Sequence, residues 1–167
     1  MLREYYKVMV VRDPLERLLS AYKDKFIPEN IKHIWIDRLS KAATGRRGGK
    51  SNDFTFLQFL RLILQLKPGK FEGHWDRYHD YCTPCSIDYS FIGNTDKLSK
   101  EIPYILDKIG VKANDLPRKV PWENKAKYPR KKTSYFADIP MDVIKGVWNL
   151  YKEDYEMFGY NFTVPNL

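Results

Sequence analysis

The sequence has few of the residues that most often build metal or redox sites. Its 167 residues include two cysteines and three histidines, which are too few for the clusters of both that usually hold structural zinc. No stretch approaches the roughly 18 apolar residues of a membrane-spanning helix, and no signal peptide opens the sequence. We therefore expect no metal site and a single domain, residues 1–167, without a membrane anchor of its own.

Basic charge is what the sequence has in excess. Lys and Arg number 29 against 21 Asp and Glu, which gives a formal net charge of +8. This excess favours an anionic partner: nucleic acid, a nucleotide, a membrane surface or an acidic polysaccharide. A basic domain with no special partner is the plain alternative.

The order of the apolar segments predicts an α/β fold. Strands are expected at residues 5–11 and 87–93. Helices are expected at residues 14–26, 31–43, 56–66, 95–109 and 140–158. A parallel sheet buried on both faces needs more than two strands, so we expect this sequence to form the later part of a larger domain.

The junction between the first strand and the first helix has the pattern of an anion site. In "VVRDPLERLLSAYKDKF", residues 10–26, Asp13 is expected to cap the helix and Pro14 to occupy its first position. A helix N-terminus placed directly after a strand suits phosphate, and Arg12 adds a planar fork for its oxygens. Ser20 lies about 10 Å along the helix, within reach of the same anion. Alternatively, Arg12 pairs with a carboxylate and Ser20 is solvated.

The same stretch closely resembles the 3′-phosphate-binding motif of Golgi carbohydrate sulfotransferases, above all those that sulfate chondroitin, dermatan and terminal glucuronic acid. The matching positions are Arg12, Arg17, Ser20, Tyr22 and Lys25. The resemblance continues in "HWDRYHDYCTPCSIDYSFIGNTDKL" and "YKEDYEMFGYNF". It implies a P-loop-like sulfotransferase fold with a parallel sheet, whose first strand–loop–helix unit would precede Met1.

The resemblance also implies a reaction and a location. A sulfuryl group would pass from 3′-phosphoadenylyl sulfate to a sugar hydroxyl of an acidic glycan such as chondroitin or dermatan, with no metal. Arg12 and Ser20 would hold the 3′-phosphate of the donor, and Lys131, Lys132 and Thr133 would close over the same nucleotide. The protein would lie in the Golgi lumen, as part of a single-pass type II membrane protein whose anchor is not in this sequence.

Further candidate residues lie outside the donor motif. His74 and the neighbouring Trp75 are the candidates for contact with the acceptor, His74 being the better one, and no residue is assigned as the catalytic base. Cys82 and Cys85 are compatible with redox chemistry, half a zinc site, a structural disulfide or two buried thiols; we favour a structural role, and a disulfide would suit an oxidising lumen. Asn161 begins "NFT", a glycosylation acceptor.

A second phosphate loop is not evident. "TGRRGGKS", residues 44–51, leaves three residues rather than four between Gly45 and Gly49, so it is not a Walker loop. The resemblance places the loop that grips the 5′-phosphosulfate upstream of Met1. An inactive, truncated sulfotransferase-like module that binds acidic glycans is therefore the main alternative. A nucleic-acid binder is a third possibility, but it lacks a recognisable reading motif.

Overall fold

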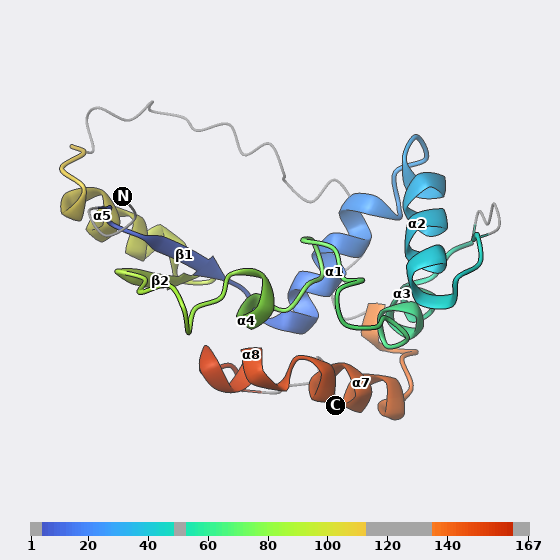
Figure 1. Cartoon of the computed structure of the whole chain (residues 1–167). Coiled ribbons are helices and arrows are strands. Elements are labelled where there is room, and N and C mark those ends of the chain that lie inside the picture. Colours follow the sequence, from blue (N-terminus) through green and yellow to red (C-terminus); the bar gives the residue numbers. More distant parts are fainter. Residues whose placement is uncertain (1–4, 49–52, 113–134, 162–167) are drawn as a thin grey trace. The chain divides into compact units, whose positions relative to one another are not determined.

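A computed structural model describes residues 5–48, 53–112 and 135–161 (Figure 1). Its elements in chain order are β1 (Val8–Val11), α1 (Pro14–Lys25), α2 (Lys32–Thr44), α3 (Phe56–Ile63), α4 (Tyr78–Tyr81), β2 (Phe91–Asn94), α5 (Leu98–Lys108), α7 (Met141–Leu150) and α8 (Lys152–Met157). Strands and helices thus occur near the places that the apolar pattern predicts, with α4 as a short addition.

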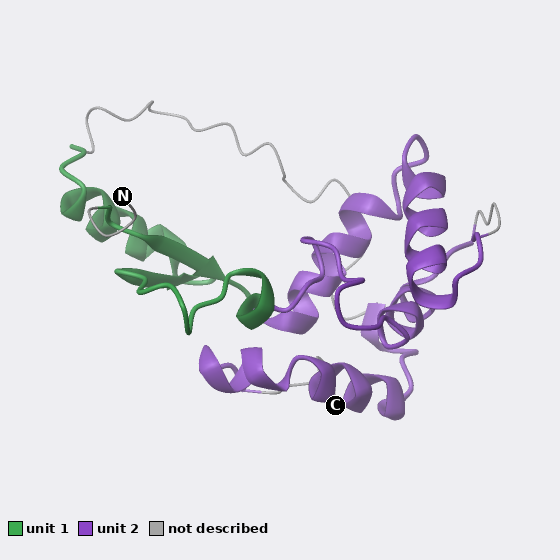
Figure 2. Cartoon of the chain, viewed as in Figure 1, with its two compact units in different colours: residues 1–12, 78–127 green, residues 13–77, 128–167 purple. Residues whose placement is uncertain are grey.

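The chain divides into two compact units (Figure 2). The first unit consists of residues 1–12 and 78–127, and the second of residues 13–77 and 128–167. Each unit therefore combines segments that are far apart in the sequence. The division falls between Arg12 and Asp13, inside the stretch that resembles a donor motif.

The first unit contains a parallel two-stranded sheet. β1 pairs with β2 in a register that sets Val8 opposite Phe91 and Val11 opposite Asn94. Helix α5 packs against β2, and the rings of Phe91 and Tyr104 lie 5.6 Å apart. The two strands and their parallel pairing agree with the sequence prediction.

The predicted inward face of α5 is only partly covered. Ile102 and Ile109 were expected to point inward, but they are 38% and 48% exposed, and α5 has no fully buried residue. The expectation was wrong for these two side chains. The physical reason is that a two-stranded sheet offers too narrow a surface to cover a helix of this length.

The second unit is helical, and its core is aromatic. Helix α3 packs against α1, α2 and α7 (Figure 1). The predicted apolar stripe of α1 is buried in this core and consists of Leu15, Leu18, Leu19, Tyr22 and Phe26. The rings of Phe26 and Phe59 lie 5.0 Å apart, and both contact the ring of Trp75. Such ring pairs bury large apolar areas and hold each other in fixed geometry.

Local capping signals begin two of these helices. The Asp13 carboxylate accepts a hydrogen bond from the Glu16 N–H at 2.9 Å, as predicted for the start of α1. Thr55 and Gln58 form the predicted capping box at the start of α3. In both places the side chains satisfy backbone donors that the first helical turn leaves unpaired.

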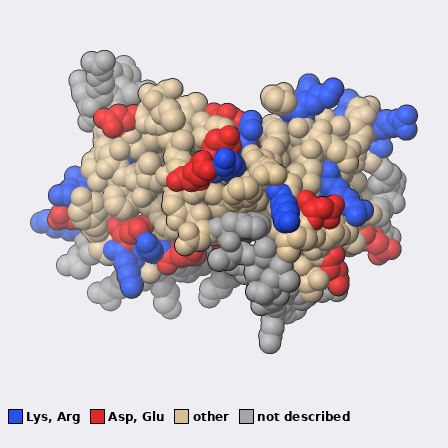
Figure 3. All heavy atoms as spheres, turned by 90° about the horizontal axis from the view of Figure 1, so that it is seen from below, with Lys and Arg blue, Asp and Glu red and all other residues tan. Residues whose placement is uncertain are grey.

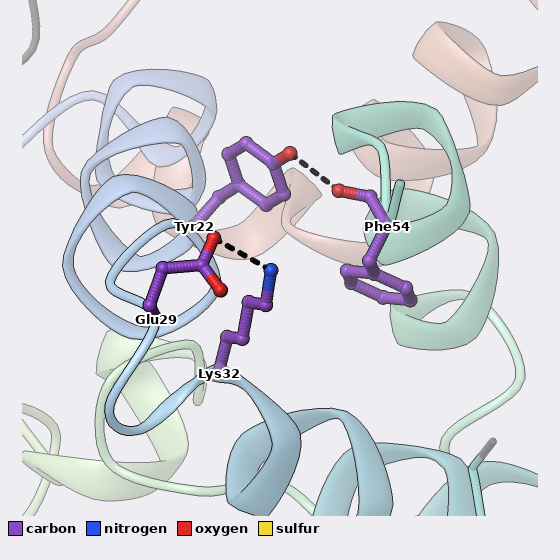
Figure 4. A network of polar contacts seen from close by, with 4 residues as sticks. All are labelled: Tyr22, Glu29, Lys32 and Phe54. Atoms are coloured by element: carbon purple, nitrogen blue, oxygen red, sulfur yellow. Dashed lines mark hydrogen bonds and ion pairs between the residues drawn. The ribbon is translucent and has the colours of Figure 1, made fainter. Parts of the chain in front are cut away.

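The loops on either side of α2 are fastened by polar contacts (Figure 4). The Tyr22 hydroxyl donates to the Phe54 carbonyl at 2.7 Å, which ties the segment before α3 to α1. The Lys32 ammonium lies 2.7 Å from the Glu29 carboxylate, although the Lys32 side chain is only 4% exposed. A buried ammonium needs such a partner because desolvation otherwise penalises its charge.

The last predicted helix is broken in two. Tyr151 adopts φ −110° and ψ 18°, which ends α7 and starts α8 in a new direction. Its ring is fully buried, and its hydroxyl donates to the Trp75 carbonyl. This hydrogen bond ties the junction of α7 and α8 to the loop that carries Trp75. Gly146 lets α7 approach α3, because a Cβ there would lie 3.0 Å from the Leu64 side chain.

Candidate functional site

Arg12 lies at the carboxyl edge of the sheet in the first unit. It directly follows β1 and is half-buried. The Thr95 N–H donates to the Val11 carbonyl at 3.0 Å, so the chain leaving β2 adjoins the chain leaving β1. Ligands of open α/β sheets bind outside the carboxyl ends of the strands. The structure thus places the predicted phosphate ligand at the edge where such sheets bind anions.

Some of the backbone amides that start α1 already donate hydrogen bonds within the protein. Pro14 has no N–H, the Glu16 N–H donates to the Asp13 carboxylate, and the Arg17 N–H donates to the Asp13 carbonyl at 2.8 Å. A carboxylate at the cap also offsets the positive end of the helix dipole. The expectation that the helix N-terminus itself holds phosphate stays a prediction.

Ser20 is an exposed residue on α1. It lies outside the buried stripe, next to the fully buried Leu18 and Leu19. Arg12 belongs to the first unit and Ser20 to the second. The exposure of Ser20 agrees with a role in binding, and its joint action with Arg12 stays a proposal.

Arg17 fastens a distant loop to α1. Its guanidinium donates to the Gly73 carbonyl at 2.8 Å and also to the Asp76 carbonyl. Tyr151 donates to the Trp75 carbonyl between them. Three carbonyls of residues 73–76 are therefore satisfied by side chains from α1 and from the break after α7. The sequence analysis gave Arg17 no role, and its place in the motif was the only signal.

Two phenols of the second unit, those of Tyr151 and Tyr155, are buried. Burial raises the pKa of the Tyr151 phenol above its usual range, the positive charge of Arg17 opposes this shift, and the carboxylate of the buried Asp154 reinforces it. Burial likewise raises the pKa of the Tyr155 phenol, and the Asp13 carboxylate adds to the rise. Both phenols are therefore neutral at physiological pH. As neutral groups they are able to donate hydrogen bonds.

His74 and Trp75 differ in their accessibility. His74 is exposed, its N–H donates to the Glu72 carboxylate at 3.0 Å, and its ring meets the Trp35 ring edge-on at 5.6 Å. Trp75 is only 3% exposed and packs against Phe26 and Trp35. The Trp75 side chain belongs to the core, and its predicted contact with the acceptor stays a prediction. His74 stays a candidate.

The structure shows less about the remaining predicted site residues. Cys82 and Cys85 are not joined by a disulfide in the structure. They lie in successive turns: the Cys82 N–H donates to the Tyr78 carbonyl, and the Ser86 N–H donates to the Thr83 carbonyl. The predicted donor-closing residues Lys131, Lys132 and Thr133 lie outside the described residues. Asn161 is exposed.

Charge is distributed rather than gathered on the face shown in Figure 3. Lys and Arg side chains lie at several places there, interspersed with Asp and Glu. Among residues 5–48, 53–112 and 135–161, no group of His, Cys, Asp or Glu is arranged to hold a metal ion. None of the helices in these ranges is long and apolar enough to cross a membrane.

Comparisons with known proteins agree with the family resemblance of the motifs. The model of the sulfotransferase family matches residues 1–161. Carbohydrate sulfotransferase 14 of Danio rerio is 32% identical over 99% of this chain and 46% of its own length. Carbohydrate sulfotransferase 10 of Xenopus laevis and that of Homo sapiens are each 32% identical over 95% of this chain and 48% of their own length.

The chain thus spans about half the length of the curated relatives it matches. No solved structure matches it significantly. Because the family model covers nearly the whole chain, and because the relatives are similar over almost all of it, the chain belongs to the sulfotransferase family.

Proposed function

We propose that the protein transfers a sulfuryl group from 3′-phosphoadenylyl sulfate to a hydroxyl of a glycosaminoglycan or of a glycoprotein glycan. The observation that carries the proposal is the strand–Arg12–capped-helix arrangement, with Arg12 at the carboxyl edge of a parallel sheet. The relatives of the chain are named as carbohydrate sulfotransferases, which supports a sugar acceptor. In the reaction the bond between sulfur and the phosphate oxygen of the donor breaks and a bond from sulfur to the sugar oxygen forms; adenosine 3′,5′-bisphosphate leaves, and the hydroxyl proton passes to a base that is not assigned to a residue.

The residues of this chain act on the non-reacting end of the donor. Arg12 and Ser20 bind the 3′-phosphate through side-chain donors, and Lys131, Lys132 and Thr133 close over the nucleotide. Binding energy at a remote phosphate orients the sulfuryl group without touching it. The groups that stabilise charge at the reacting end belong, on this proposal, to a segment upstream of Met1.

The acceptor and the location follow from the same resemblance. We assign the acceptor to acidic glycans such as chondroitin or dermatan and the enzyme to the Golgi lumen, as the lumenal part of a single-pass type II membrane protein. The exposed Asn161 in a glycosylation sequence supports a lumenal chain. A disulfide between Cys82 and Cys85 in that oxidising space stays a prediction.

Titration with adenosine 3′,5′-bisphosphate tests the donor site. Arg12→Ala removes a charge-assisted hydrogen bond worth roughly 1.5–3 kcal/mol, so affinity is expected to fall roughly 10- to 150-fold. Arg61→Ala, which removes an exposed arginine from α3, is the matched control. Ser20→Ala is expected to weaken the bisphosphate more than a nucleotide without the 3′-phosphate. Unchanged affinity in a folded Arg12 variant would refute the assignment.

A transfer assay separates the enzyme from a binding module. Labelled sulfate is followed from the donor to desulfated chondroitin, with this 167-residue chain and with the same chain joined to its natural upstream segment. We expect transfer only from the longer protein, because preorganised donors at the reacting end are usually the largest catalytic contribution. Transfer by neither protein, together with retained glycan binding, would favour the inactive module.

A further inference from the structure

Trp35 is the centre of a cationic cluster in which only Lys25 belongs to the donor motif. The Lys25 ammonium lies 5.3 Å from the centroid of the Trp35 ring, and the Arg38 guanidinium lies 5.0 Å from it. His74 meets the same ring edge-on at 5.6 Å. Three elements of the second unit therefore bring groups that bind anions to one tryptophan: α1, α2 and the loop of residues 73–76.

The charges of this cluster are accessible to a ligand. Arg38 is exposed and forms no ion pair with any residue in the described ranges. Lys25 is paired with Asp24; the Lys25 side chain is 19% exposed and the Asp24 side chain 58% exposed. Ion pairs that solvent reaches contribute little stability, so an incoming anion can replace the Asp24 carboxylate at modest cost.

Contacts with the core of the second unit hold the cluster in place. Trp35 packs edge-on against the buried Trp75, with ring centroids 5.7 Å apart. Arg17 and Tyr151 fix the carbonyls on either side of His74. Cation–aromatic contacts restrict the two long basic side chains further. A site whose cations are ordered before binding loses less conformational entropy when the ligand arrives.

We propose that Lys25, Arg38 and His74, arranged around Trp35, bind the carboxylate of an acidic sugar in the acceptor. The planar guanidinium suits a carboxylate in two-point contact, and the ammonium adds a point charge beside it. Single-stranded nucleic acid would instead use an open aromatic face for stacking, but cations lie over the Trp35 ring. That the carboxylate belongs to the acceptor of a transfer reaction rests on the proposed function.

Binding of desulfated chondroitin, measured by calorimetry on the full-length protein without donor, tests this subsite. Arg38→Gln and Lys25→Gln are each expected to weaken binding about tenfold, the usual scale for one charge-assisted hydrogen bond. The matched controls Arg61→Gln and Lys67→Gln remove exposed cations of the same unit. They are expected to change affinity less than twofold. Arg38→Lys is expected to restore part of the loss.

A second polymer identifies the recognised group. Carboxyl-reduced chondroitin keeps the sugar backbone without the charge, and it is expected to bind weakly and equally to the wild type and to all variants. Equal losses in the subsite and control variants would overturn the proposal, because they would show general charge attraction only. Undiminished binding of the reduced polymer would overturn it too, as would a stronger effect of the subsite variants on single-stranded DNA than on chondroitin.

Failure of the proposed subsite can be distinguished from failure of the proposed sulfuryl transfer. The binding assay contains no donor, and affinity for adenosine 3′,5′-bisphosphate is expected to be the same in the Arg38 variants as in the wild type. If sulfate is not transferred but the subsite pattern is present, the proposed reaction fails and the subsite stands. If sulfate is transferred and Arg38→Gln leaves the acceptor KM unchanged, the subsite fails and the reaction stands.

Discussion

Removing the Arg17 guanidinium is expected to release residues 73–76 from α1. This side chain donates to two carbonyls, those of Gly73 and Asp76, from a half-buried position. A hydrogen bond from a charged donor contributes roughly 1.5–3 kcal/mol. Solvent reaches part of the group, so the lower value applies to each bond. We expect Arg17→Ala to lower the free energy of unfolding by about 3 kcal/mol, since both carbonyls lose their partner.

Urea unfolding followed by tryptophan fluorescence measures this loss, because Trp35 and Trp75 both lie in the affected unit. Arg17→Lys keeps the charge but lacks the two-pronged geometry, and it is expected to recover less than half of the loss. The matched control Arg61→Ala is expected to stay within about 0.5 kcal/mol of the wild type, as exposed substitutions usually do. If Arg17→Ala behaves like that control, the two hydrogen bonds do not hold the loop.

A local readout separates fastening of the loop from general stability. Amide hydrogen exchange at residues 73–77 is expected to accelerate in Arg17→Ala under conditions where the core of α3 stays protected, because these amides would open by local unfolding. The affinity for desulfated chondroitin is expected to fall as well, since His74 is carried by the released loop. Uniform acceleration across the second unit would contradict a local role for Arg17.

Three further outcomes follow from caps, buried phenols and thiols. The free energy of unfolding is expected to fall above about pH 10. Burial raises the pKa of the Tyr151 and Tyr155 phenols in the folded protein, so the unfolded chain loses these phenol protons at a lower pH than the folded chain. The slope is about 1.4 kcal/mol per pH unit for each phenol, and a urea midpoint that stays constant from pH 8 to 11 would refute it. Thr55→Ala, which removes the side-chain cap of α3, is expected to cost about 1 kcal/mol in the same assay; no change would contradict the cap. Mass spectrometry of unreduced protein from a secretory host is expected to find Cys82 joined to Cys85, and two free thiols would remove that prediction.

Local signals predicted the features that depend on neighbours in the sequence. The start of α1 could be read from Asp13 and Pro14, and the start of α3 from Thr55 and Gln58, because a cap involves residues within one helical turn. The buried stripe of α1 followed from its periodicity. The likeness of the donor motif to those of carbohydrate sulfotransferases also needed only the order of residues.

Contacts between distant segments could not be predicted in this way. Arg17 meets Gly73 across 56 positions, and Tyr151 meets Trp75 across 76 positions. Through these hydrogen bonds Arg17 of the motif holds residues 73–76. Trp75, which the sequence suggested as an acceptor contact, is buried in the core. No periodicity or spacing in the sequence predicts such a contact, because the contact depends on how several helices pack together.

The sequence by itself thus determined the α/β order, the capped helix after Arg12 and the resemblance to sulfotransferases, because each depends on adjacent residues and on their pattern. Only the tertiary structure decided that the Arg17 guanidinium is occupied by the carbonyls of Gly73 and Asp76. It alone also decided that Lys25, Arg38 and His74 meet at Trp35. The physical reason is that burial and long-range hydrogen bonding, rather than local propensity, select which polar groups are consumed by the fold and which face a ligand.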